Sequence, residues 1–118
     1  EAPAVFKRNG RYYMLSSGCT GWDPNKAKWA VADSIMGVWQ LKDNPCMGRE
    51  ADKTFYAQST YVLPVEGKPD QYIAMFDRWN KTDLIDSRYI WLPIEFHGDK
   101  PFIRWADQWS TENMEAVY

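Results

Sequence analysis

The chain has 118 residues, enough for one hydrophobic core, and its 14 basic and 16 acidic side chains give a net charge of −2. This balance provides no electrostatic surface for nucleic acid or an anionic membrane, and no apolar run approaches the roughly 18 residues of a membrane span. Seven Trp and seven Tyr supply enough aromatic area for a folded core, which excludes a disordered chain. One His and two Cys are too few for a structural zinc site of four such ligands, and we expect no metal and no cofactor.

Short runs rich in Val, Ile, Tyr, Phe and Trp alternate with Gly, Pro, Asn and Asp, a pattern typical of an all-β chain. In the first half this pattern predicts strands at Pro3–Lys7, Arg11–Ser17, Lys28–Ser34 and Gly37–Leu41. The dipeptide Asn9-Gly10 tolerates the positive φ of a tight hairpin and should join the first two strands. A loop, Gly18–Lys26, separates the second strand from the third.

The second half repeats this plan after residues 42–57, which are predicted to be a connecting loop. Four further strands are expected at Gln58–Val65, Gln71–Arg78, Arg88–Phe96 and Pro101–Trp109. Two four-stranded antiparallel units, 1–41 and 58–109, indicate either two blades of a larger β-propeller or a small eight-stranded β-sandwich. Residues 110–118 are predicted to be a tail or linker.

Several strings of residues point to one family. Glu1–Leu15 resembles the Glu-(Gly/Ala)-Pro segment, followed by Gly-x-Tyr-Tyr-Leu, of glycoside hydrolase family 43, whose members fold as five-bladed β-propellers. The resemblance continues through Ser17–Asn25, Ala32–Ser34, Gln58–Val65, Asp77–Trp79 and Tyr89–Ile94. Over residues 1–109 these strings are similar to the branch of exo-β-1,3-galactanases and related arabinogalactan-degrading enzymes. The resemblance implies that the chain is a fragment, the C-terminal two blades, whose partners are the missing N-terminal blades.

The resemblance also implies a catalytic arrangement. Family 43 enzymes invert the anomeric carbon, so one carboxylic acid protonates the leaving oxygen while a base on the opposite face activates water. The family's general acid matches Glu1, and the carboxylates that usually complete the site precede it in the sequence. In the galactan-cleaving branch, an amide at the position of Gln58 is a candidate for the base through a relay. Gln58 could equally hydrogen-bond a sugar hydroxyl. The isolated 118-residue piece is expected to be inactive.

Other residues are candidates for binding sugar. Trp22 lies in a polar loop, where it either stacks on sugar or anchors the loop. Asp77 and Arg78 end an apolar strand, where they either contact hydroxyls or form a surface ion pair. Tyr89 and Trp91 are two residues apart in a predicted strand, so their side chains lie on the same side of the sheet. There they either line the pocket or pack between blades.

These residues predict a glycosidase, of exo-β-1,3-galactanase or α-L-arabinofuranosidase type. It would act on β-1,3-galactan or on the side chains of plant arabinogalactan, and be secreted or periplasmic. The alternative is a non-catalytic carbohydrate-binding β-propeller module, and neither reading involves nucleic acid or a membrane. Cys19 and Cys46 either form a disulfide, as is credible in an exported protein, or are two buried free thiols.

Overall fold

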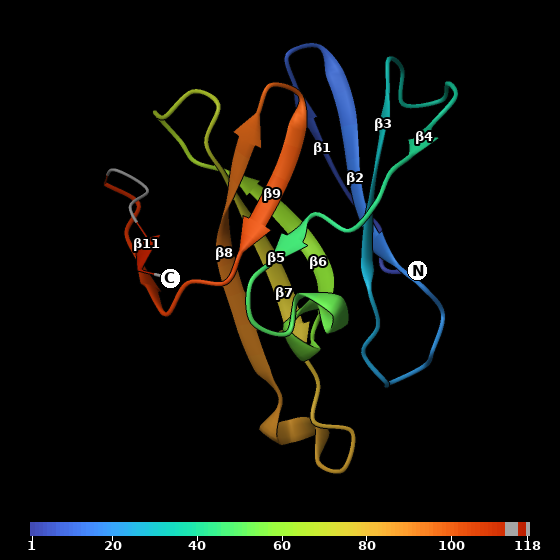
Figure 1. Ribbon diagram of the computed structural model, residues 1–118, viewed down its shortest axis with the longest axis vertical. Helices are drawn as coiled ribbons and strands as arrows, with labels where there is room; N and C mark the ends of the chain where they lie inside the picture. Colours follow the sequence, from blue (N-terminus) through green and yellow to red (C-terminus); the bar gives the residue numbers. More distant parts are fainter. Residues whose placement is uncertain (113–115, 118) are drawn as a thin grey trace.

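Strands make up nearly all of the regular structure in the computed structural model, which describes residues 1–112 and 116–117 (Figure 1). The strands are β1 (Ala4–Arg8), β2 (Arg11–Ser17), β3 (Ala27–Ala32), β4 (Gln40–Leu41), β5 (Cys46–Met47), β6 (Gln58–Pro64), β7 (Tyr72–Arg78), β8 (Arg88–His97), β9 (Lys100–Arg104), β10 (Gln108–Trp109) and β11 (Ala116–Val117). The helical segments of the described residues are two short 3-10 helices, η1 (Ala51–Tyr56) and η2 (Leu84–Asp86). The expected all-β fold is confirmed.

The first sheet has the order β1-β2-β3-β4, with every neighbouring pair antiparallel, as predicted. Its first hairpin turns at Asn9 and Gly10, whose φ values of 50° and 76° are the left-handed ones that this dipeptide tolerates. The last strand, β4, is shorter than expected. The reason is that the chain after β3 turns back on itself, with the Gly37 N–H donating to the Ser34 carbonyl at 2.9 Å.

The second sheet has the order β5-β9-β8-β7-β6 and therefore one strand more than predicted. The extra strand, β5, comes from the expected connecting loop and pairs with β9 in parallel. The predicted strand Pro101–Trp109 is interrupted, because β9 ends at Arg104 and β10 pairs with β11 instead. Of the predicted tail, residues 113–115 and 118 lie outside the described residues.

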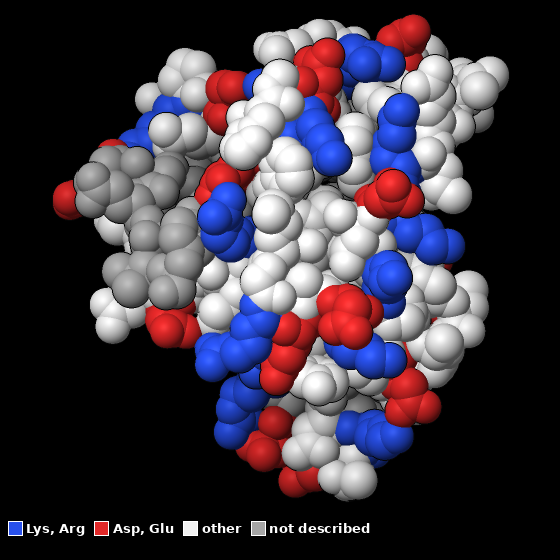
Figure 2. Space-filling model, viewed as in Figure 1, with Lys and Arg blue, Asp and Glu red and all other residues white. Residues whose placement is uncertain are grey.

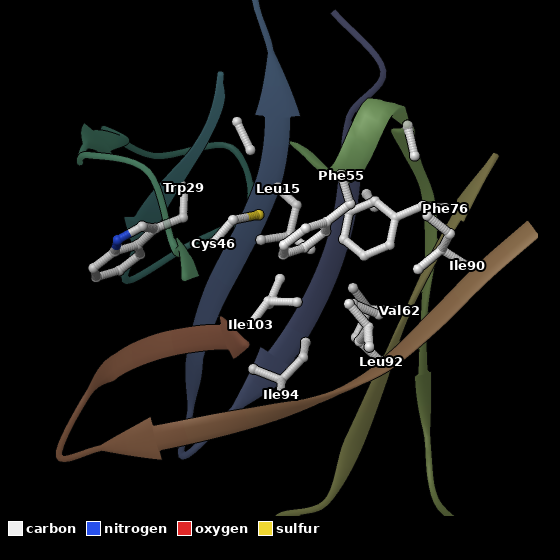
Figure 3. Packing of buried hydrophobic residues seen from close by; sticks show 14 of the residues in the cluster. Leu15, Trp29, Cys46, Phe55, Val62, Phe76, Ile90, Leu92, Ile94 and Ile103 are labelled. Carbon is white, nitrogen blue, oxygen red and sulfur yellow. The ribbon is translucent and has the colours of Figure 1, made fainter. Parts of the chain in front are cut away.

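The core lies between the two sheets, each of which turns an apolar face toward the other. Period-two alternation places every second side chain of a strand on this inner face. The buried residues of the cluster include Phe6, Tyr13, Leu15, Trp29, Val62, Phe76, Ile90, Leu92 and Ile94. Figure 3 shows Phe55 and Ile103, both fully buried, filling the space between Leu15 on one side and Phe76 and Leu92 on the other. The core is therefore built from both sheets together.

Arg8 joins the two sheets at the end where β1 and β2 turn. Its side chain is 8% exposed, and its guanidinium donates to both carboxylate oxygens of Asp70, in the turn between β6 and β7. A further N–H donates to the Gly98 carbonyl at 3.0 Å, and the guanidinium lies 3.9 Å from the centre of the Phe96 ring. The hydrogen bond to Asp70 raises the pKa of Arg8. One buried charge thus connects three turns from both sheets.

The two cysteines do not pair. Cys19 is exposed and Cys46 is buried in β5, and both are free thiols, so neither the disulfide nor the pair of buried thiols is found. Burial raises the pKa of the Cys46 thiol to about 12. Cys46 is therefore almost wholly protonated at neutral pH.

Replacing Asp70 by Asn should destabilise the fold, because the guanidinium of Arg8 would keep its burial and lose its nearest counter-charge, leaving the more distant Asp99 carboxylate at 3.8 Å. We expect a loss of about 1–3 kcal/mol in the free energy of unfolding, measured by urea denaturation. Asp33→Asn is the matched control, since Asp33 is 89% exposed and pairs with the partly exposed Arg11. It should cost below about 1 kcal/mol. Equal losses in the two variants would contradict the inferred role of Arg8.

The two thiols should also react at very different rates with a thiol reagent such as Ellman's reagent at pH 8. Cys19 should be labelled rapidly, whereas Cys46, with about one thiolate in ten thousand at that pH, should react only after unfolding. A Cys19→Ser variant should lack the rapid phase. This arrangement would be contradicted if both thiols were labelled slowly, or if neither were labelled until a disulfide had been reduced.

Candidate functional site

One end of the two sheets is hollowed by a cavity of about 520 Å³. The end of β7 lies beside the start of β6 because these strands are antiparallel, and the end of β2 reaches them from the first sheet. Figure 1 shows the loop after β2 and the loop between β7 and β8 projecting at that end, opposite the β1–β2 turn. The lining includes Ser17 from β2, Gln58 from β6, Asp77 and Arg78 from β7, and Trp22 from the loop after β2. The cavity therefore draws on both sheets.

The structure gathers most, but not all, of the residues expected to form a site. Trp22, Gln58, Asp77 and Arg78 line the cavity together. Tyr89 is 75% exposed and lines a smaller hollow of about 270 Å³, which shares Trp22 and Asp77 with the cavity. Trp91 lies apart from both, in a hollow beside Trp105 and Trp109.

Glu1 reaches the cavity through its main chain. It is exposed and is not among the lining residues, but its backbone pairs with that of Ser17 in both directions. The Glu1 nitrogen donates to the Ser17 carbonyl at 2.7 Å, and the Ser17 N–H donates to the Glu1 carbonyl at 2.9 Å. On the other side of Ser17, Gln58 Nε2 donates to Ser17 Oγ at 3.2 Å. Ser17 thus joins Glu1 and Gln58 at the rim.

Two tryptophans from different sheets form an aromatic part of the wall. Trp22 is 52% exposed and meets Trp79, which follows β7, edge to face, with the ring centres 4.6 Å apart. Beside them Lys81 Nζ lies 2.6 Å from Asp23 Oδ1, so an ion pair joins the same two loops. The hydrogen bond from Lys81 lowers the pKa of Asp23. A half-exposed ring such as that of Trp22, next to polar side chains, suits the binding of a sugar, which has apolar CH faces and a hydroxyl rim.

The backbone just before β6 is strained. Thr54, Phe55 and Tyr56 have φ values of 52°, 56° and 59°, a left-handed conformation that costs an L-residue about 1–2 kcal/mol. Arg78 Nε and Nη2 both donate to the Phe55 carbonyl, at 3.1 and 2.7 Å. Arg78 therefore bonds to the main chain of this turn, and no hydrogen bond between Arg78 and Asp77 is found within the described residues.

Sequence reasoning missed several residues of the cavity. They include Asn25, Tyr56, Trp79, Lys81 and Arg88. Trp79 could have been found, because it directly follows Asp77 and Arg78 at the end of the same strand. Asn25 and Lys81 lie in loops and Tyr56 in η1, where no local pattern shows which way the chain turns, and Arg88 is the first residue of β8.

The charge distribution is mixed. On the face in Figure 2, acidic and basic side chains are interspersed over both sheets. Over the part of the chain that the structure describes, no helix is long and apolar enough to cross a membrane. Within the same residues no three His, Cys, Asp or Glu side chains are grouped so as to hold a metal ion.

No family model and no curated protein matches the chain, but solved structures do. A GH43 β-1,3-galactosidase with galactodeoxynojirimycin is 55% identical with a TM-score of 0.88, over 92% of this chain and 32% of its own. A second GH43 β-1,3-galactosidase is 42% identical with a TM-score of 0.92, over 97% and 24%. An exo-β-1,3-galactanase from Phanerochaete chrysosporium, a Glu-to-Ala variant with β-1,3-galactotriose, is 38% identical with a TM-score of 0.83, over 94% and 25%.

The two packed β-sheets match part of the β-propeller of the GH43 structures, which defines the class of the fold. At up to 55% identity over nearly the whole chain, the protein belongs to glycoside hydrolase family 43, on the side of the β-1,3-galactosidases and exo-β-1,3-galactanases. It spans between 24% and 32% of the length of these three relatives.

The ion pair beside the tryptophans can be tested by its effect on Asp23. An NMR titration of the Asp23 carboxyl should give a pKa below the ordinary value of 3.8, and Lys81→Met should return it toward that value. Because the pKa is lowered in the folded state, the pair stabilises the loops above the ordinary pKa, and this contribution is lost as the pH falls through the lowered value. Lys42→Met, in the segment between the sheets, is the control and should leave the Asp23 titration unchanged. A pKa of 3.8 in the unmodified protein would contradict the pairing.

Proposed function

We propose that the chain is part of an enzyme that hydrolyses the O-glycosidic bonds of β-1,3-galactan, or of arabinogalactan side chains, with inversion at the anomeric carbon. The observation that carries this proposal is the junction at Ser17, which ties the main chain of Glu1 and the side chain of Gln58 to the rim of one cavity. The relatives at 55% and 42% identity are β-1,3-galactosidases, which favours the galactanase type over the arabinofuranosidase type.

In this proposal Glu1 is the general acid. Its protonated carboxyl group donates a proton to the glycosidic oxygen as the bond to the anomeric carbon breaks, while water attacks that carbon from the opposite face. Gln58 donates through Nε2 to Ser17 Oγ, and its carbonyl oxygen is an acceptor for the attacking water or a sugar hydroxyl. An amide is a poor proton acceptor, so we assign Gln58 the role of orienting its partner. Trp22 supplies the ring on which a sugar face stacks.

The proposal also includes further β-propeller blades as partners of this chain. The outer face of the second sheet exposes Tyr61, Leu63, Tyr89 and Trp91, with exposed fractions between 39% and 75%. Side chains of this kind are usually buried against a partner. Since the relatives are three to four times as long, we assign this face to contact with another blade.

Because its polymeric substrate lies outside the cell, the enzyme would be secreted or periplasmic.

A second candidate function is carbohydrate binding without cleavage. One observation favours it: Glu1 is exposed and is not among the residues that line the cavity. In that case the tryptophan wall and the polar residues of β6 and β7 would bind galactan, and no bond would be broken.

The two functions are separated by Glu1→Gln in the longest natural chain that contains this segment. We expect the kcat for β-1,3-galactotriose to fall by about 10²–10⁴, because the amide cannot protonate the leaving oxygen. Hydrolysis of an aryl galactoside whose phenol needs no proton to leave should fall much less. Glu66→Gln, in the exposed turn between β6 and β7 at the other end of the sheets, is the matched control and should retain activity.

Two outcomes would count against this proposal, the first against the role of Glu1 and the second against hydrolysis itself. Unchanged activity in Glu1→Gln would remove Glu1 from the mechanism. If the unmodified full chain binds the trisaccharide but releases no sugar, the protein is a carbohydrate-binding module and not a hydrolase. The 118-residue segment alone should release no sugar, since the proposed mechanism needs carboxylates from the further blades.

A further inference from the structure

The left-handed turn at Thr54, Phe55 and Tyr56 lies directly before the start of β6. Consecutive non-glycine residues with positive φ are held in place only where the surrounding structure fixes them, and such strain gathers at functional sites. Ala57 is already extended, with φ −136° and ψ 178°, and the strand begins at Gln58. The conformation of the turn therefore sets the direction in which β6 enters the cavity, and with it the place of the Gln58 amide.

Two side chains from different sheet regions hold this turn. Thr54 Oγ1 donates to the Asn25 carbonyl at 2.6 Å, and Arg78 donates through Nε and Nη2 to the Phe55 carbonyl at 3.1 and 2.7 Å. A carbonyl that accepts two N–H groups of one planar guanidinium is fixed in direction, because the fork cannot rotate about one bond without breaking the other. The Phe55 ring is fully buried and lies 6.4 Å from the Phe76 ring, edge to face.

We propose that Arg78 is a positioning residue for Gln58. Its guanidinium fixes the Phe55 carbonyl, the fixed carbonyl keeps residues 54–56 left-handed, and the turn delivers Gln58 to Ser17 at the rim of the cavity. From the sequence, Arg78 is expected either to contact sugar hydroxyls or to form a surface ion pair with Asp77. The two bonds to Phe55 favour the role of a positioning residue over both. The catalytic consequence rests on the proposed function, whereas the structural consequence does not.

The structural consequence is tested first, by comparing crystal structures of the full-length protein and its Arg78→Met variant. In the variant we expect residues 54–56 to leave the left-handed region and the bond from Gln58 to Ser17 to be lost. Arg49→Met is the matched control: Arg49 lies 5.4 Å from the same Trp105 ring that Arg78 approaches at 5.8 Å, and it does not line the cavity. A turn that stays left-handed in Arg78→Met would overturn the proposal.

The kinetic consequence is tested with β-1,3-galactotriose. Because a misplaced catalytic group mainly affects the transition state, Arg78→Met should lower kcat by about 100-fold and change KM by less than about threefold. Added methylguanidinium should restore part of the lost kcat, and Arg78→Lys, which keeps the charge but not the fork, should be intermediate. Arg49→Met should match the unmodified protein. A raised KM with unchanged kcat would identify Arg78 as a direct sugar contact and overturn the proposal.

Two further outcomes remain decisive. If Arg78→Met does not fold, Arg78→Lys replaces it in both comparisons, with the same expected directions. If the unmodified full-length protein releases no sugar, the proposed function fails, and the crystal structures alone decide whether Arg78 positions Gln58.

Discussion

Burial of the two inner sheet faces against each other is the constraint on which this structure depends. Each sheet has one apolar face that is rich in aromatic residues. If either of these two faces stayed in water, the fold would lose most of the hydrophobic free energy that its side chains contribute. Phe6, Tyr13 and Trp29 on the first sheet therefore require Phe76 and Leu92 on the second. The turns at one end are then close enough for a buried arginine to join them, and the loops at the other end are close enough to enclose a cavity.

The cavity follows from strand direction as much as from side chains. In antiparallel sheets the end of one strand lies beside the start of the next, so residues distant in the sequence share an edge. Within the second sheet, Gln58 and Asp77 share an edge in this way. Ser17 meets Gln58 because the first sheet packs against the second, and Trp22 likewise reaches Trp79 from a loop of the other sheet. The residues that hold the site rigid and the residues that face a ligand therefore belong to the same few loops, as is common for sites placed on a β scaffold.

The strands could be predicted because they depend on local patterns, whereas Glu1 and Gln58 are singled out by the resemblance to family 43 and their roles stay a prediction. Alternating apolar residues fix the strand faces, and a polar residue at the end of an apolar strand, such as Asp77, indicates where that strand leaves the core. The strand β5 could not be predicted, since two residues carry no alternation and the partner is far along the chain. Nor could the left-handed turn, because Thr54 and Phe55 are not the glycine or asparagine that usually mark positive φ.

The parallel pairing of β5 with β9 also has a consequence for how the protein behaves in a crowded solution. A strand at the edge of a sheet offers free N–H and C=O groups on which another chain can grow. Here the N–H groups of Ile103 and Trp105 are already bonded to the carbonyls of Pro45 and Met47. At the opposite edge, Ser59 Oγ on β6 donates to the Ala2 carbonyl at 2.6 Å. On the β5 side the outermost strand is only two residues long, and a short edge strand is a poor template for the addition of another chain.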